Sequence, residues 1–187
     1  VFIYRFGEGT AEQSRWASVD APYSPYYNWL NLPFYKHGIQ LSGTAFMIIT
    51  VVVMAGTSNA VNLTDGMDGL ASGCMVLTAI AFIGLTLATG SSYELADQFN
   101  FRYIEKADEL AIVCGAIVGA CLGFLWYNAY PAQVFMGDTG ALPLGGLIGY
   151  VAIVIRQEPM LFIVGGVFVI EAVSVLLQIF HYKTTGR

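Results

Sequence analysis

Five long apolar runs constrain this chain more than any other feature of its sequence. They cover residues 39–56, 71–89, 110–127, 140–155 and 160–180. Each is close to the ~20 residues that an α-helix needs to cross the hydrocarbon core of a bilayer. Only 11% of the residues are charged, whereas a soluble domain carries about 25%. The sequence therefore predicts an all-α polytopic membrane protein.

The charge and the cysteine content argue against two classes of function. The net charge is −5 and the pI is about 4.8, so a nucleic acid is not expected as a partner, because proteins that bind one present basic surfaces. Cys74, Cys114 and Cys121 all lie inside apolar runs. We interpret them as packing residues, and not as a disulfide framework or a zinc site.

Residues 1–38 differ from the rest of the chain. The first few resemble the end of a truncated span, and residues 7–38 are polar, rich in aromatic side chains and interrupted by three prolines. Amphipathic aromatic side chains collect at membrane interfaces. We therefore expect an interfacial or periplasmic segment, with a disordered loop as the alternative. The membrane-spanning region is then 39–187, which we expect to be incomplete at both ends.

A polar loop with regular spacing separates the first two apolar runs. It reads Asn59-Ala-Val-Asn-Leu-Thr-Asp-Gly-Met-Asp-Gly-Leu70 and contains no Lys or Arg that could neutralise its two aspartates. A second polar loop, Asn128–Thr139, follows the third apolar run. Because two spans lie between these loops, we expect both at the same membrane face.

Three aspartates in these loops are candidates for a metal site. Asp65 and Asp68 belong to the first loop, and Asp138 belongs to the second. Carboxylates that cluster without a cation repel one another, and Mg²⁺ typically takes one or two carboxylates plus substrate phosphates. Asp68 precedes a predicted helix start and could instead act as its N-cap. Glycines at positions 66, 69, 137 and 140 permit tight turns and close backbone approach.

Amide and aromatic side chains accompany the aspartates. Asn59, Asn62 and Asn128 could hydrogen-bond a sugar, a nucleobase or phosphate oxygens, or could simply form turns. Phe135 could stack on a base or anchor the chain at the interface. Gln178, near the end of the last apolar run, is close enough to the same face to touch a substrate.

Two features inside the spans concern packing. Glu171 lies in the middle of the last run, where an ionisable side chain should face the bundle interior, and we interpret it as a structural hydrogen-bonding residue. Glycines at positions 115, 119 and 123, and at 145 and 149, repeat every four residues. This spacing lets a neighbouring helix approach closely.

At its two polar loops the chain resembles the bacterial phospho-N-acetylmuramoyl-pentapeptide transferase family. The resemblance rests on Asn59–Ala71, on Phe124–Asp138 and on Gly165–Gln178, and it covers nearly everything from about residue 39 onward. The Asn-x-x-Asp-Gly-x-Asp-Gly core is common to the polyprenyl-phosphate sugar-1-phosphate transferases. The sequence Tyr-Pro-Ala-Gln-Val-Phe-Met-Gly-Asp is typical of the peptidoglycan branch.

The resemblance implies a ten-helix enzyme of the bacterial inner membrane, of which this chain would be a fragment. Such an enzyme transfers phospho-MurNAc-pentapeptide from UDP-MurNAc-pentapeptide to undecaprenyl phosphate, giving lipid I and UMP. The implied cofactor is Mg²⁺, and the implied partners are both substrates, the lipid bilayer and a second copy in a homodimer. The active site would face the cytoplasm, although most Lys and Arg residues are predicted at the opposite face, against the positive-inside rule.

The family pattern assigns roles to nine residues. Asp138 is the implied Mg²⁺ ligand, and with Asp65 and Asn62 it forms the implied catalytic group. The implied substrate-binding residues, which include the lining of a uridine pocket, are Asn59, Gly66, Asp68, Asn128, Phe135 and Gln178. Two mechanisms fit: a carboxylate attacks first and gives a covalent phospho-enzyme, or it deprotonates the lipid phosphate.

The chain departs from the family pattern at three points. An adjacent Asp-Asp pair and a run of three His, which the family carries, do not occur here, and Ala141 replaces the usual Ser. We therefore expect the intact protein to be active and this fragment alone to be inactive. One alternative is a related polyprenyl-phosphate HexNAc-1-phosphate transferase. A more distant one is a transporter that uses Glu171 and the aspartates as an ion path.

Overall fold

The structure is a computed structural model that describes residues 29–32 and 39–185. The prediction of an interfacial segment in residues 1–38 therefore falls mostly outside the described residues. The elements, in chain order, are β1 (Trp29–Leu30), β2 (Ile39–Gln40), α1 (Gly43–Thr64), α2 (Leu70–Gly90), α3 (Tyr93–Gln98), η2 (Ala107–Glu109), α4 (Leu110–Asn128), α5 (Gly137–Val154), α6 (Glu158–Val164) and α7 (Gly166–Thr185).

Five of the described helices are long and apolar enough to cross a membrane, which confirms the predicted all-α polytopic fold. They are α1, α2, α4 with the preceding η2, α5 and α7. Within the described ranges the helices are accompanied by a short antiparallel pair of strands, in which Leu30 of β1 lies opposite Ile39 of β2. Many large apolar side chains on the helices are exposed, as expected for surfaces that face lipid.

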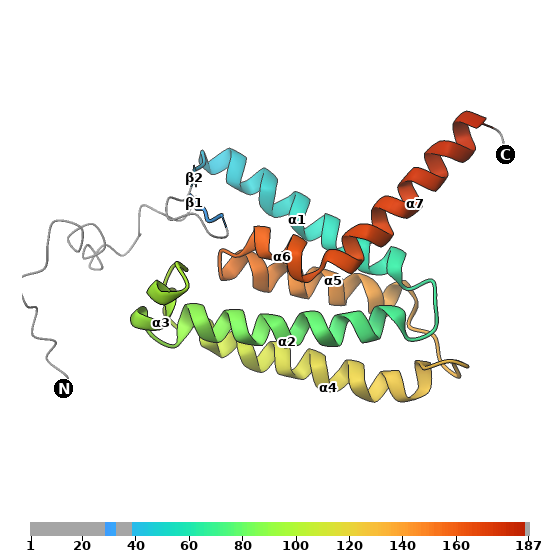
Figure 1. Cartoon of the computed structure of the whole chain (residues 1–187), viewed down its shortest axis with the longest axis horizontal. Coiled ribbons are helices and arrows are strands. Elements are labelled where there is room, and N and C mark those ends of the chain that lie inside the picture. Colours follow the sequence, from blue (N-terminus) through green and yellow to red (C-terminus); the bar gives the residue numbers. More distant parts are fainter. Residues whose placement is uncertain (1–28, 33–38, 186–187) are drawn as a thin grey trace, which may run out of the picture.

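The helices pack in pairs. α2 lies along α4, and α1 lies along α5 and also contacts α7 (Figure 1). The interior holds large apolar side chains that are almost fully buried, among them Met75 and Phe82 of α2 and Ile148 of α5. α7 extends away from the other helices toward its C-terminal end (Figure 1), and its last ten described residues are exposed.

The two polar loops lie at the same end of the bundle, as predicted by counting the spans. α1 and α4 end there, and α2 and α5 begin there (Figure 1). We call this the motif end. The opposite end, which we call the far end, carries β1, β2, α3, η2 and the start of α6 (Figure 1). The far end also contains the turn at Arg156, which has a positive φ of 58°.

Two predicted span boundaries are wrong. The first span was expected to end at residue 56, but α1 continues to Thr64. Within this extension the side chains of Thr57, Asn59 and Thr64 donate to carbonyls one turn back in the same helix. The last span was expected to be continuous over residues 160–180. Instead α6 ends at Val164, Gly165 caps it, and α7 begins at Gly166.

The glycine repeats have different outcomes in the two helices that carry them. A methyl group on Gly145 or Gly149 of α5 would collide with α1, which confirms the predicted close approach. On Gly115, Gly119 or Gly123 of α4 it would meet no atom within 4 Å. In the part of the chain that the structure describes, the α4 glycines therefore have no close helix neighbour.

Candidate active site

The loop between α1 and α2 is shorter than predicted. α1 ends at Thr64, and Asp65 caps it by donating its backbone N–H to the carbonyl of Asn62 at 3.2 Å. α2 begins after Gly69, which has a φ of 74°, in the left-handed region that glycine adopts readily. Only residues 65–69 therefore form the loop.

Asn59 and Asn62 lie in the last turns of α1, so their interpretation as turn formers is wrong. The exposed amide of Asn59 donates to the carbonyl of Ala55 at 2.7 Å, within the same helix. Asn62 is half-buried and lies three residues before Asp65. Both side chains thus come from a helix that ends at the site, which holds them more firmly than a loop would.

Asp65 and Asp68 connect the first loop to the second. One carboxylate oxygen of Asp65 (Oδ2) accepts from the backbone N–H of Gly137 at 3.1 Å. Oδ2 of Asp68 accepts from the backbone N–H of Ala132 at 3.0 Å. The suggestion that Asp68 caps α2 is wrong, because Gly69 occupies that position and no side chain caps the helix.

Asn128 is the buried centre of the site, with only 3% of its surface exposed. Its Oδ1 accepts from the backbone N–H of Gly69 at 3.1 Å and from the hydroxyl of Ser72 at 3.1 Å. Its Nδ2 donates to the carbonyl of Val134 at 2.9 Å. One amide N–H is left without a partner among the described residues. Asn128 thus joins the start of α2, the end of α4 and the second loop.

Sequence reasoning did not identify Ser72. It lies in the first turn of α2 and is fully buried. Its position inside an apolar run concealed it. The only signal was a hydroxyl three residues after Gly69, on the turn that faces the second loop.

Asp65 and Asp138 form the charged part of the site. Asp138 is exposed and lies in the first turn of α5, where the helix N-terminus favours a negative charge. Partial burial raises the pKa of Asp65, the hydrogen bond from Gly137 opposes this rise, and the negative charge of Asp138 adds to it. The two carboxylates are therefore close enough for the charge of Asp138 to act on Asp65.

The two carboxylates fit a magnesium ion. In residues 29–32 and 39–185, no group of three His, Cys, Asp or Glu side chains is placed to hold a metal ion on its own. Mg²⁺ does not require such a group, because it keeps several waters and takes one or two carboxylates plus substrate phosphates. A cation between Asp65 and Asp138 would also relieve their repulsion.

Gly66 and Phe135 are open to solvent at the motif end. Phe135 is 74% exposed, so its ring is available to stack on a planar group. Gly66 is exposed as well. Gly137, just before Asp138, has a φ of 65°, which an L side chain rarely adopts. This conformation directs its N–H to Asp65.

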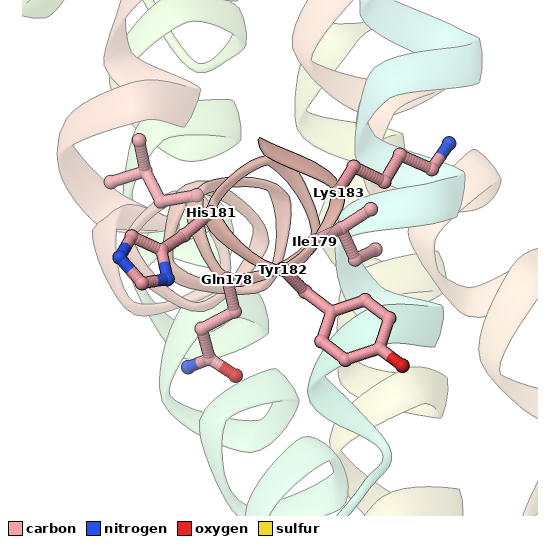
Figure 2. Close-up of a pocket in the computed structure, with 6 residues that line it drawn as sticks. Gln178, Ile179, His181, Tyr182 and Lys183 are labelled. Atoms are coloured by element: carbon pink, nitrogen blue, oxygen red, sulfur yellow. The ribbon is translucent and has the colours of Figure 1, made fainter. Parts of the chain in front are cut away.

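Gln178 does not join the other predicted residues in the structure. Its amide donates to Ser174 Oγ at 3.2 Å on the same helix. Figure 2 shows Gln178, His181 and Tyr182 around α7, and the shallow hollow there is lined by α7 residues alone.

Glu171 is partly exposed and has no hydrogen bond to another described residue, so the expected structural hydrogen bond is not present among them.

Comparison with known proteins agrees with this geometry. Residues 17–156 match the sequence model of the family described as Glycosyl transferase family 4. The phospho-N-acetylmuramoyl-pentapeptide-transferase of Neisseria meningitidis serogroup C / serotype 2a is 51% identical over 161 residues, which is 86% of this chain and 44% of that protein. Its counterpart in Neisseria meningitidis serogroup C strain 053442 is 50% identical over the same shares.

The matched region contains both polar loops and all the hydrogen bonds that join them. The chain spans less than half the length of the curated relatives it matches. Since the family model covers most of the chain, this protein belongs to glycosyl transferase family 4.

Proposed function

We propose that the full-length protein transfers phospho-MurNAc-pentapeptide from UDP-MurNAc-pentapeptide to undecaprenyl phosphate, giving lipid I and UMP for peptidoglycan synthesis. The observation that carries this proposal is the joining of the two polar loops. Asp65, Asp68 and Asn128 bind backbone groups of the opposite loop, and this brings Asp65 beside Asp138 at one end of a membrane bundle. The names of the relatives support the choice of substrate.

The arrangement suits attack of one phosphate on a diphosphate. Both reactants are anions, and Asp65 and Asp138 add further negative charge. A bound Mg²⁺ would neutralise part of this charge and position the phosphates. Asp138 and Asp65 would hold the ion, with Asp138 as the principal ligand because it is the more exposed. Asp65 and Asn62, at the end of α1, would then face the reacting phosphates.

The remaining residues would bind the nucleotide and the sugar. Phe135, with its open ring, would stack on uracil beside Gly66 and Asp68. Asn128 would act mainly by holding the loops around the nucleotide, because three of its hydrogen-bonding positions are occupied. We assign the rest of the substrate surface to Asn59 on α1 and Gln178 on α7.

We infer that the protein lies in the bacterial inner membrane with its motif end toward the cytoplasm. Nucleotide substrates are cytoplasmic, and the five spanning helices support a multi-pass position. The expected partners are the two substrates, the bilayer and a second copy of the protein. A transporter is less well supported, because Asp65, Asp68 and Asp138 gather at one end, whereas transporter sites lie near the midplane.

The test uses Asp138→Asn in the full-length protein, with Mg²⁺-dependent release of UMP as the measurement. We expect activity to fall by about 10²-fold or more, the usual loss when an electrostatic group of an active site is removed. Asp97→Asn is the matched control, because Asp97 is an exposed carboxylate on α3 at the far end. Full UMP release by Asp138→Asn would refute the proposal.

A second measurement distinguishes the substrates. One preparation receives UDP-MurNAc-pentapeptide, and another receives UDP-GlcNAc, each with undecaprenyl phosphate and Mg²⁺. We expect a lipid-linked product only with the pentapeptide substrate. A product only with UDP-GlcNAc would assign the protein to the related HexNAc-1-phosphate transferases.

A further inference from the structure

α5 lies directly against α1 at a crossing where α5 presents two glycines, which have no side chain to hold the helices apart. Gly145 and Gly149 of α5 are both buried there. A methyl group on Gly145 would lie 2.7 Å from the Cα of Ser58 and 2.9 Å from the carbonyl carbon of Thr57. A methyl group on Gly149 would collide with the side-chain hydroxyl of Thr57.

A hydrogen bond fixes the same crossing. The hydroxyl of Ser58 donates to the carbonyl of Leu142 at 2.9 Å. The next residue, Pro143, lies inside α5 and lacks the N–H that would complete the helix ladder, so α5 is weakened at this point. The Ser58 bond holds α5 against α1 one residue before the proline, and Gly145 contacts α1 two residues after it.

The crossing lies the same number of residues away from each of the two carboxylates, Asp65 along α1 and Asp138 along α5. Seven residues separate Ser58 from Asp65 along α1, and seven separate Asp138 from Gly145 along α5. Seven residues are two helical turns, or about 10 Å. Between the crossing and the two aspartates both chains are continuous helix. A change in the helix separation at the crossing is therefore transmitted to the aspartates.

We propose that Gly145 and Gly149 are positioning residues that set the separation of Asp65 and Asp138 by letting α5 lie directly on Thr57 and Ser58 of α1. This inference rests on the proposed function, in which the two carboxylates act together on one metal ion. In this inference the glycines do not contact the substrate.

The size of the expected effect follows from the contact distances. Ordinary carbon contacts are about 3.5–4.0 Å, so a methyl group on Gly145 must move α1 and α5 apart by about 1 Å. A misplacement of about 1 Å can reduce an enzymatic rate by about 10²-fold. On Gly149 the methyl group meets a side chain instead of the backbone, so the effect should be smaller and reversible by trimming Thr57.

The test compares four variants of the full-length protein. Gly145→Ala should lower kcat by about 10²-fold with an unchanged KM for the nucleotide, because the substitution leaves the proposed nucleotide-binding residues Gly66, Asp68 and Phe135 unchanged. Gly149→Ala should have a smaller effect, and Gly149→Ala with Thr57→Ala should recover. Gly146→Ala is the matched control: it adds the same methyl group to the same helix, where nothing lies within 4 Å.

Two readouts do not depend on transfer activity. The affinity for Mn²⁺, which accepts the same oxygen ligands as Mg²⁺, is measured by EPR. The separation of the helix ends is measured by EPR between nitroxide labels on Leu63→Cys and Thr139→Cys, in a background without the three native cysteines. Gly145→Ala should weaken Mn²⁺ binding and lengthen or broaden the label distance, and Gly146→Ala should change neither.

The outcomes separate the two proposals. If the wild type releases UMP and Gly145→Ala matches Gly146→Ala in kcat, Mn²⁺ affinity and label distance, the positioning role is wrong. A fall in kcat that Thr57→Ala does not reverse in the Gly149→Ala background would likewise contradict it. If the wild type transfers nothing, the proposed function fails, and the label distances and Mn²⁺ affinities still decide whether the crossing sets the carboxylate separation.

Discussion

The two ends of the bundle handle their polar groups in opposite ways. At the motif end the carboxylates of Asp65 and Asp68 are partly exposed and accept backbone N–H groups, and Asp138 is exposed. At the far end Glu158 is 2% exposed, and neither of its carboxylate oxygens has a hydrogen-bond partner among the described residues. Arg156 forms an ion pair with it at 4.0 Å.

This difference distinguishes the motif end, whose carboxylates can bind a ligand, from the far end, whose buried charged groups serve the structure. A carboxylate that is exposed and held by backbone donors remains available to a cation or substrate. A buried one acts only on its neighbours: for Glu158 this is Arg156, whose guanidinium carbon in turn lies 4.2 Å from the centre of the Phe46 ring. We therefore expect the loss of a carboxylate at the motif end to reduce activity, and the loss of a charged group at the far end to alter stability without reducing activity.

The largest expected difference between the ends comes from replacing one carboxylate with an amide at each of them. Asp65→Asn should reduce UMP release by about 10²-fold or more, because it removes a charge that acts on the reacting phosphates. Glu158→Gln should leave UMP release close to the wild-type level. Both are assayed in the full-length protein at saturating Mg²⁺. Equal losses in the two variants would remove the distinction between the ends.

Asn128 should be the most important residue for stability at the motif end. Asn128→Ala leaves the N–H of Gly69, the hydroxyl of Ser72 and the carbonyl of Val134 without their buried partner. Each such loss costs about 1 kcal/mol or more, so we expect the free energy of unfolding to fall by about 3 kcal/mol. Denaturant unfolding in micelles measures it. Asn59→Ala is the control, since that amide bonds only its own helix, and it should have little effect.

Much of the fold was predictable from the sequence, because it depends on hydrophobicity and on counting. Five apolar runs of sufficient length gave five helices, and two spans between the polar loops placed both loops at one end. The helix ends were less predictable. Asn59 and Thr64 look like loop residues, yet both lie in α1 and donate their side-chain hydrogens to its own carbonyls, a pairing that residue type alone does not predict.

The site was only partly predictable for a similar reason. Asp65, Asp68 and Asn128 were identified from their residue types and spacing. Their partners could not be, because Gly137, Ala132 and Val134 contribute backbone groups that any sequence possesses. The pair at the far end was not anticipated either, because the sequence does not show that Glu158 is buried or that the guanidinium of Arg156 lies over the Phe46 ring of α1.

Removing the cation at the far end should destabilise the protein in a pH-dependent way. Burial raises the pKa of Glu158 above its ordinary value of 4.5, and Arg156 opposes this rise. The folded protein therefore keeps the Glu158 proton to a higher pH than the unfolded chain, and stability falls as the pH rises from 4.5 through the folded pKa. Arg156→Gln removes the opposing cation, so the fall becomes larger.

We expect Arg156→Gln to cost about 2 kcal/mol at pH 8 and less at pH 5. This lies below the loss for a fully buried ion pair, because the Arg156 side chain is 19% exposed and the pair is 4.0 Å apart. Denaturant unfolding at both pH values measures the difference. Adding Glu158→Gln should remove the pH dependence. A loss that is equal at both pH values would show that the two groups do not interact.

The smallest expected effects concern the backbone, where the ends again differ. At the motif end the positive-φ positions are Gly69 and Gly137; at the far end they are non-glycine residues, including Lys106 with a φ of 64°. Gly137→Ala meets no atom within 4 Å, so only backbone strain remains, and it should cost about 1 kcal/mol. Lys106→Gly should stabilise by a similar amount, because it relieves the same strain. Thermal unfolding of both variants measures this, and a destabilised Lys106→Gly would show that the far end depends on the Lys106 side chain and not on its backbone conformation.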